Sequence, residues 1–349
     1  MSLTSTAHSA RNLIKYGGAS LILFTLVYSG MRAGIKAYRA AHPVYVAPTV
    51  RYGILPKIIF PDKEYQKKEF EMLLPNDSLP KLPDQNRVYV VYRPINTFLA
   101  LDYEIKTAQN LGFTHQGVET NPGSSIYQFS NDLLNQRLTI NVLDGSFHLK
   151  YPYETDQMLL VAGGAPNREE AIQNARAYLN GSGKMTTDLE GGEKKVSFWK
   201  IDFDGLKAVP AQSEAHLTRV DFFRTPLEGG NKIMTSEVNS APVSVLLSNS
   251  TVEGKRVVEV NYKYVNIDRQ SFETYPIKTV NEAVAELKRG NYWPAVDSQN
   301  SRVAIRNIYL AYFEPITLTN YMQPIFVFEG DGGFVAYVAA ILDKWISSH

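Results

Sequence analysis

The stretch from Tyr275 to Leu342 constrains the fold of this chain most, because it combines a complete helix signature with strands in a fixed order. Thr279 and Glu282 have the spacing of a capping box, and Gly290 is a typical helix terminator. Between them, apolar residues recur at helical spacing: Val280, Ala283, Val284 and Leu287. Alternating apolar residues then predict one strand within residues 302–315 and a hairpin within 323–341. This order indicates an α+β unit.

A looser copy of the same order precedes this stretch. Asn167 and Glu170 predict the start of an earlier helix, and alternating strands follow it. The matched segments are 220–229 with 308–317 and 242–262 with 324–341. The match lies in element order and apolar period rather than in identities, so chance similarity of two α+β units remains the alternative. We expect tandem modules, each a helix packed on a curled antiparallel sheet.

The whole chain of 349 residues divides, on this interpretation, into six segments. They are a polar tail (1–12), a transmembrane helix (13–37), a proline-rich linker (38–86), a first α+β domain (87–160), and two modules (161–265 and 266–349). Within the linker, the apolar stretch 48–61 is expected to lie along the domain that follows, and residues 63–74 to form a short helix. The first α+β domain reads as strand, helix (98–111), strand and a hairpin turning at 144–145.

The predicted transmembrane helix rests on an uncharged run from Tyr16 to Met31, flanked by Lys15 and Arg32. Sixteen residues of helix reach roughly 24 Å, and snorkelling of the flanking charges can cover the remainder of a hydrocarbon core of about 30 Å. A cleaved signal peptide and a soluble helix are the alternatives, although no clean cleavage site follows. A short basic tail before a long remainder is typical of a signal anchor, which places residues after about 40 outside the cytoplasm.

Three segments near the C-terminus, 275–293, 305–315 and 323–340, resemble the PepSY-like, cystatin-type module of the YycI/YycH family. The resemblance covers 275–342 well and the central part only by element order. It implies a bacterial protein with one N-terminal span and an extracytoplasmic domain that modulates a sensor kinase. It offers no catalytic residues for this chain.

Residues suited to chemistry are sparse or scattered. The chain has no cysteine, which removes disulfides and thiolate chemistry, and its six histidines form no paired metal-binding motif. A net charge of +1 gives no support to nucleic-acid binding. We therefore expect no enzyme activity, no cofactor and no metal.

The tyrosine-rich strand near the C-terminus is the candidate binding surface. Tyr309, Tyr312, Phe313 and Tyr321 would suit a protein partner if exposed, since aromatic residues are enriched at interfaces. Alternating tyrosines on an amphipathic strand are, however, ordinary core residues, and the pattern favours that interpretation.

These features favour a membrane-anchored, extracytoplasmic binding or regulatory protein of a bacterial envelope, acting through protein–protein contacts. Its expected partners are the lipid bilayer, through residues 13–37, and a protein of the envelope. The first alternative is a structural subunit of a secretion, pilus or wall-synthesis assembly. An envelope hydrolase with a site built from dispersed residues is a further alternative.

Overall fold

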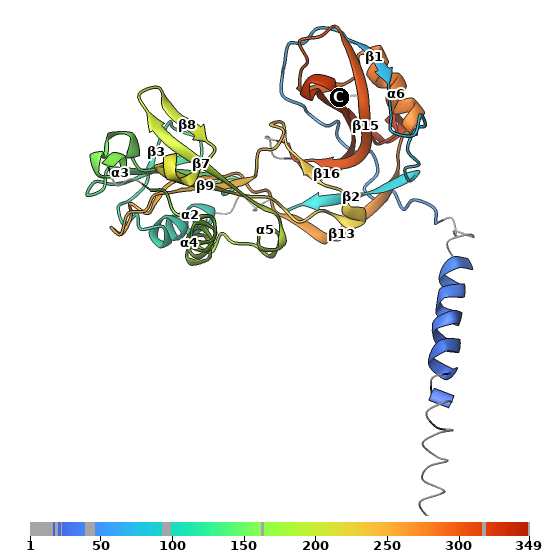
Figure 1. Cartoon of the computed structure of the whole chain (residues 1–349). Coiled ribbons are helices and arrows are strands. Elements are labelled where there is room, and N and C mark those ends of the chain that lie inside the picture. The colour runs from blue at the N-terminus through green and yellow to red at the C-terminus, as the bar shows by residue number, and fades with distance from the viewer. Residues whose placement is uncertain are drawn as a thin grey trace, which may run out of the picture. The chain divides into compact units, whose positions relative to one another are not determined.

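The computed structural model describes residues 17, 20–21, 23–38, 46–92, 99–161, 164–315 and 319–347. The chain divides into two units, residues 1–48 and 49–349, and each is described by itself. In the first unit, residues 23–38 form a helix (Figure 1). Its described side chains are all exposed. Within the described residues, no helix is both long and apolar enough to cross a membrane. The predicted tail 1–12 and residues 13–16 of the predicted span lie outside the described residues.

The second unit contains two β-sheets, and helices pack on each. The eight-stranded sheet has the order β1 (Glu69–Met72), β15 (Arg302–Phe313), β16 (Tyr321–Gly330), β17 (Val335–Ala339), β14 (Trp293–Val296). Off this path, β10 (Ile233–Met234) pairs with β15, and β2 (Gln85–Val91) pairs with both β16 and β13 (Ile267–Pro276). We call this sheet and its helix α6 (Val280–Arg289) the eight-stranded lobe.

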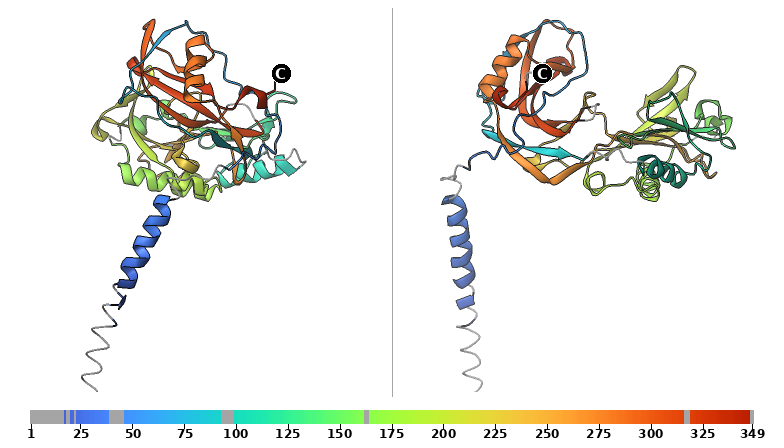
Figure 2. Two further views of the ribbon diagram at one scale, coloured as in Figure 1. Left: turned by 90° about the vertical axis from the view of Figure 1, so that its right-hand side faces the viewer. Right: turned by 180° about the vertical axis from the view of Figure 1, so that it is seen from behind.

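The nine-stranded sheet is antiparallel throughout. Its order is β3 (Val118–Glu119), β4 (Ile126–Asn131), β5 (Gln136–Asn141), β6 (Phe147–Lys150), β12 (Val257–Tyr262), β11 (Val243–Leu247), β9 (Leu217–Phe222), β7 (Lys194–Asp202), β8 (Gly205–Val209). It carries the helices α2 (Leu99–Asn110), α3 (Gln157–Val161), α4 (Arg168–Gly181) and α5 (Thr187–Gly191). The helices α2 and α4 lie side by side on one face of it (Figure 2). We call this part the nine-stranded lobe.

Each lobe has its own core, built where the apolar stripe of a helix meets the apolar face of a sheet. In the nine-stranded lobe, Ala171, Ala175 and Leu179 of α4 are fully buried in a cluster with sheet residues such as Val220 and Val245. In the eight-stranded lobe, the fully buried residues Ala283 and Leu287 of α6 share a cluster with Phe326, Phe328 and Val303. Both arrangements are α+β, as expected.

The helix predictions near the capping motifs are confirmed. Asn167 accepts a hydrogen bond from Glu170 N at 3.0 Å, and the capping box of Thr279 and Glu282 is complete. Gly290 ends α6 in the left-handed conformation, with φ of 94°. The hairpin within 137–150 also forms, but its connection runs from residue 142 to 146 rather than through a two-residue turn.

Three expectations about organisation differ from the structure. The predicted helix over 63–74 is wrong, because β1 forms there by parallel pairing with β15. Much of the predicted linker 38–86 belongs to the eight-stranded lobe: Leu55 is fully buried and its N–H donates to Trp345 O at 2.8 Å. The expected boundary at residue 160 does not separate sheets, since strands on both sides of it build the nine-stranded sheet.

The predicted repeat agrees with the strand order in part. The strands β9, β11 and β12 are consecutive neighbours in one sheet, as β15, β16 and β17 are in the other. The strand that precedes each group of three is placed differently. In the nine-stranded sheet, β7 pairs with β9, the first strand of its group, whereas in the eight-stranded sheet β14 pairs with β17, the last strand of its group. The two helix-plus-strand sections therefore share three strands of common topology.

Candidate functional site

The structure places two of the four candidate surface residues in the core. Tyr312 and Phe313 are 1% exposed, so in this fold they do not present side chains to a partner. Tyr312 is held inside the eight-stranded lobe, where its hydroxyl donates to Asn86 Oδ1 at 2.8 Å. Phe313 packs against the ring of Tyr337, with 6.0 Å between ring centroids. Both side chains are buried because the end of β15, residues 310–313, is covered on both faces.

The other two candidates, Tyr309 and Tyr321, are half-buried. The hydroxyl of Tyr309 donates to Glu329 Oε1 at 2.8 Å, and burial, with this carboxylate nearby, raises the pKa of Tyr309. The ring of Tyr321 stacks on Tyr52 at 4.9 Å. Both already have partners within the eight-stranded lobe, and their contact with another protein stays a prediction.

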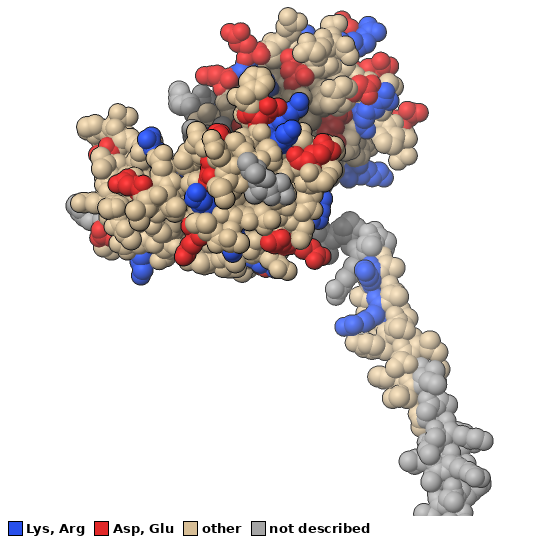
Figure 3. Space-filling view, turned by 60° about the vertical axis from the view of Figure 1, so that its left-hand side comes forward, with Lys and Arg blue, Asp and Glu red and all other residues tan. Residues whose placement is uncertain are grey.

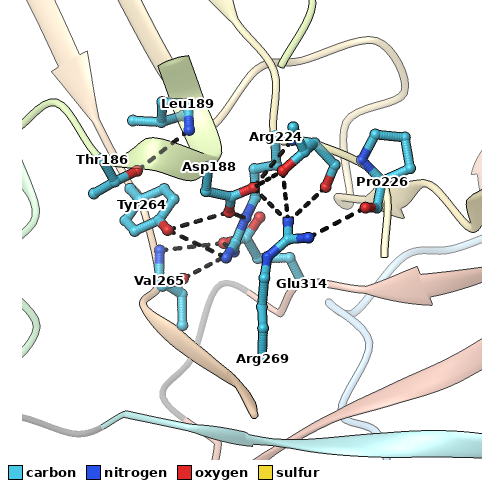
Figure 4. Close-up of polar contacts among 10 residues, drawn as sticks. Thr186, Asp188, Leu189, Arg224, Pro226, Tyr264, Val265, Arg269 and Glu314 are labelled. Atoms are coloured by element: carbon cyan, nitrogen blue, oxygen red, sulfur yellow. Dashed lines mark hydrogen bonds and ion pairs between the residues drawn. The ribbon is translucent and has the colours of Figure 1, made fainter. Parts of the chain in front are cut away.

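The structure buries three charged side chains elsewhere, where the two lobes meet (Figure 4). Arg224 follows β9, Asp188 lies in α5, and Glu314 follows β15. Arg224 Nε lies 2.7 Å from Asp188 Oδ2, and Arg224 Nη1 lies 2.9 Å from Glu314 Oε1. All three side chains are at most 7% exposed. Asp188 and Arg224 come from the nine-stranded lobe and Glu314 from the eight-stranded lobe, so this pair of contacts joins the lobes.

Further groups complete what we call the junction network: Asp188, Arg224, Tyr264, Arg269 and Glu314. The hydroxyl of Tyr264 donates to Asp188 Oδ2 at 3.1 Å, and Arg269 Nη2 donates to Asp188 Oδ1. Arg224 Nη1 also donates to the backbone carbonyl of Val265, at 2.8 Å. The network therefore contains two carboxylates and two guanidinium groups, so its formal charges balance.

Local packing explains why Asp188 and Arg224 meet. Thr186 caps α5 by accepting a hydrogen bond from Leu189 N at 3.3 Å, which fixes the first turn that carries Asp188. At the end of α5, the backbone of Gly192 approaches residue 223 so closely that any Cβ there would overlap the carbonyl oxygen of Phe223. A glycine is therefore required for the α5 backbone to lie against the segment that carries Arg224.

The pKa directions show how the network holds its charges. Burial raises the pKa of Asp188, but Arg224 and the hydrogen bonds to Thr225 and Arg224 outweigh it, so the pKa of Asp188 is lowered. Burial lowers the pKa of Arg224, and the neighbouring Glu314 and Asp188 more than compensate, so its pKa is raised. Burial dominates at Glu314, whose pKa is raised in spite of Arg224.

Three adjoining cavities surround the network. A cavity of about 310 Å³ shares Asp144, Tyr264 and Val265 with a second of about 670 Å³. It also shares Glu237 and Glu314, among other residues, with a third of about 780 Å³. Volumes of 300–1,000 Å³ are typical of sites for small molecules. At the junction, buried charge and accessible space therefore coincide.

The charged groups at the junction differ in how readily they exchange protons. Guanidinium groups do not exchange protons near neutral pH, and the low pKa of Asp188 makes it a weak base. In the part of the chain that the structure describes, no group of three His, Cys, Asp or Glu side chains is placed to hold a metal ion. On the face drawn in Figure 3, acidic and basic residues are interspersed rather than gathered by sign.

Sequence reasoning missed the junction network, because its members are far apart in the chain. Arg224 and Asp188 are 36 residues apart, and Arg224 and Glu314 are 90 apart. One signal was available: Arg224 and Glu314 each follow directly after a pair of aromatic residues at the end of an apolar strand. A charge in that position is either at the surface or paired inside.

Comparison with known proteins gives distant similarities. No family model matches the chain, and no curated protein matches it. A crystal structure of an uncharacterized protein from Eubacterium rectale is similar with a TM-score of 0.40 and 15% identity, over 73% of this chain and 82% of that one. The C-terminal domain of YpeB from Bacillus megaterium is similar with a TM-score of 0.29 and 12% identity, over 72% of this chain and 100% of that domain.

Proposed function

We propose that the chain is a membrane-anchored protein of a bacterial envelope that acts outside the cytoplasm by binding a protein partner, without catalysis. Residues 13–37 form the anchor, and residues 49–349 form the binding part. The resemblance of residues 275–342 to the YycI/YycH module supports a regulatory role over a purely structural one.

The observation that carries this proposal is the surface of the N-terminal helix. Leu23, Phe24, Leu26 and Met31 are each more than 60% exposed, although they are large and apolar. Exposure of several such side chains on one helix is unfavourable in water, and a lipid environment removes the penalty. Arg32 and Lys36 follow, where they can reach lipid headgroups.

The anchor is tested by membrane fractionation of the full chain and of a Leu23→Arg/Leu26→Arg variant. A charge at the centre of a spanning helix costs about 2.5–3.5 kcal/mol, so the variant should leave the membrane pellet that retains the natural chain. A Leu23→Ile/Leu26→Ile variant keeps the apolar surface and should remain in the pellet. A natural chain found in the soluble fraction would contradict the anchor.

The orientation and the partner need separate measurements. A C-terminal alkaline phosphatase fusion, which is active only after export, should be active, and an inactive fusion would reverse the orientation. Cross-linking in intact cells should capture one discrete protein partner. Recovery of many subunits in fixed ratio would favour the structural alternative instead.

A further inference from the structure

The cavity of about 310 Å³ beside the junction network is bounded by four separate segments of the chain. They are the turn between β5 and β6, the segment 235–242 before β11, the residues after β12 and the residues after β15. Its apolar lining comes from Ala241, Pro242, Val265 and Pro315. The volume is enough for a small molecule or one large side chain.

The charged residues that line this cavity are mainly acidic. Asp144, Glu237 and Glu314 contribute carboxylates, and Lys263 contributes the opposing positive charge. Asp144 lies in the β5–β6 turn, where one oxygen accepts from Ser146 N at 2.8 Å and the other from Asn141 Nδ2 at 3.2 Å. Each oxygen of Asp144 can accept a further hydrogen bond. The lining therefore favours a cation over an anion.

Glu314 provides an independent indication that a donor belongs here. Its Oε1 accepts from Arg224 Nη1 at 2.9 Å and from Val265 N at 3.2 Å. Its Oε2 is buried and has no hydrogen-bond partner among the described residues. A buried carboxylate oxygen without a donor is costly, because burial has removed the water that would otherwise donate to it. The raised pKa of Glu314 agrees with an incompletely compensated carboxylate.

We propose that this cavity binds a primary ammonium group carried on a short apolar stem. The ammonium group donates to the carboxylates of Glu314 and Asp144, and the stem packs against Pro242 and Val265. An ammonium group has three donors, so it can donate to more than one of the carboxylates that line the cavity. A free organic amine and the lysine side chain of a protein partner share this chemistry. The lysine of a protein partner rests on the partner-binding function proposed above, whereas a free amine does not.

Calorimetric titration of the full chain in a non-ionic detergent tests the proposal with three probes. Phenethylamine carries the ammonium group, phenethyl alcohol is its neutral analogue, and a doubly capped lysine represents a partner's side chain. We expect phenethylamine to bind at least about tenfold more tightly than the alcohol, since a charged hydrogen bond contributes about 1.5–3 kcal/mol. Equal binding of amine and alcohol, or no amine binding up to about 10 mM, would overturn the proposal.

Variants locate the binding to this cavity. Asp144→Asn should weaken phenethylamine binding about tenfold. Glu237→Gln changes an exposed residue, so it leaves the fold intact and should weaken binding about threefold. Glu253→Gln is the matched control, because Glu253 is exposed in the β11–β12 connection and does not line this cavity. An equal loss in the control, or no loss in either cavity variant, would refute the location.

The outcomes also separate this inference from the proposed function. Tighter binding of the capped lysine than of phenethylamine would indicate a protein side chain as the natural ligand, and the reverse order a free amine. Amine binding by a chain that fails the membrane and cross-linking tests would support the cavity and refute the proposed function. Failure of all three probes with a confirmed anchor and partner would refute only the cavity.

Discussion

Replacement of Arg224 by methionine tests whether the junction network holds the two lobes together. Methionine keeps much of the volume but removes the charge that faces Asp188 at 2.7 Å and Glu314 at 2.9 Å. Asp188 retains Arg269 as a partner, whereas Glu314 keeps only the hydrogen bond from Val265 N. Removal of one partner from a buried ion pair typically costs 3–5 kcal/mol, and we expect that loss at pH 7.

The loss of unfolding free energy in Arg224→Met can be worked out from Glu314. Without Arg224, this buried carboxylate can avoid an unpaired charge by taking up a proton. Its ordinary pKa is 4.5, so protonation at pH 7 costs about 1.36 × 2.5, or roughly 3.4 kcal/mol, relative to the unfolded chain. At pH 5 the same step costs only about 0.7 kcal/mol. Both protonation costs are upper limits for the effect of the substitution, because the pKa of Glu314 is already raised in the natural chain. The cost of Arg224→Met should therefore shrink by about 2–3 kcal/mol between pH 7 and pH 5.

Urea unfolding of the full chain in detergent at both pH values measures this difference. Arg306→Met is the matched control, because Arg306 pairs with Asp331 at 2.8 Å on an exposed surface and its loss should hardly move the midpoint. A cost for Arg224→Met below about 1 kcal/mol at pH 7, or equal costs at pH 5 and 7, would refute the reasoning.

Three further predictions concern the helices and acid stability. Thr279→Ala removes the capping box with Glu282 and should lower the free energy of unfolding by about 1 kcal/mol, measured in urea. Leu287→Ala, at a fully buried position of α6, should lower the free energy of unfolding by about 2–5 kcal/mol in the same assay. A smaller loss would mean that neighbouring side chains fill the space that the leucine leaves. The pKa of Asp188 is lowered from 3.8, so its contribution to the free energy of unfolding is present above pH 3.8 and is lost as the pH falls through the pKa of the folded state. Asp188→Asn should therefore reduce the loss of unfolding free energy at acid pH.

The parts of the fold that could be predicted depend on short-range signals. The start of α6 is set by Thr279 and Glu282, three residues apart, and its end by the backbone conformation of Gly290. The start of α4 is set in the same way by Asn167. Such signals act within one turn of helix, so they are visible in the sequence without knowledge of the rest of the structure.

The parts that could not be predicted depend on pairing over long distances. Residues 69–72 lie in a segment rich in Lys, Glu and Leu, which favours helix, yet they form a strand. Glu69 pairs in parallel with Arg302, so a partner 233 residues away decides the conformation. In the same way, β2 lies beside β13 and β16 rather than beside the strands that follow it in the chain. Local preference is a weak guide where tertiary pairing satisfies the backbone.

The junction network combines a signal visible in the sequence with a pairing over a long distance. The sequence matched the strand around 220–229 with the strand around 308–317, and both segments continue from an aromatic pair into a charge. A two-residue shift of that match places Arg224 opposite Glu314, and the structure brings these two side chains to 2.9 Å. They follow β9 and β15, each of which is the outermost strand of the three that share a topology between the lobes. In the three-strand topology that the lobes share, they therefore meet through corresponding strand ends of opposite charge. The buried ion pair then joins the copies, because Arg224 is the one ion-pair partner of Glu314 among the described residues.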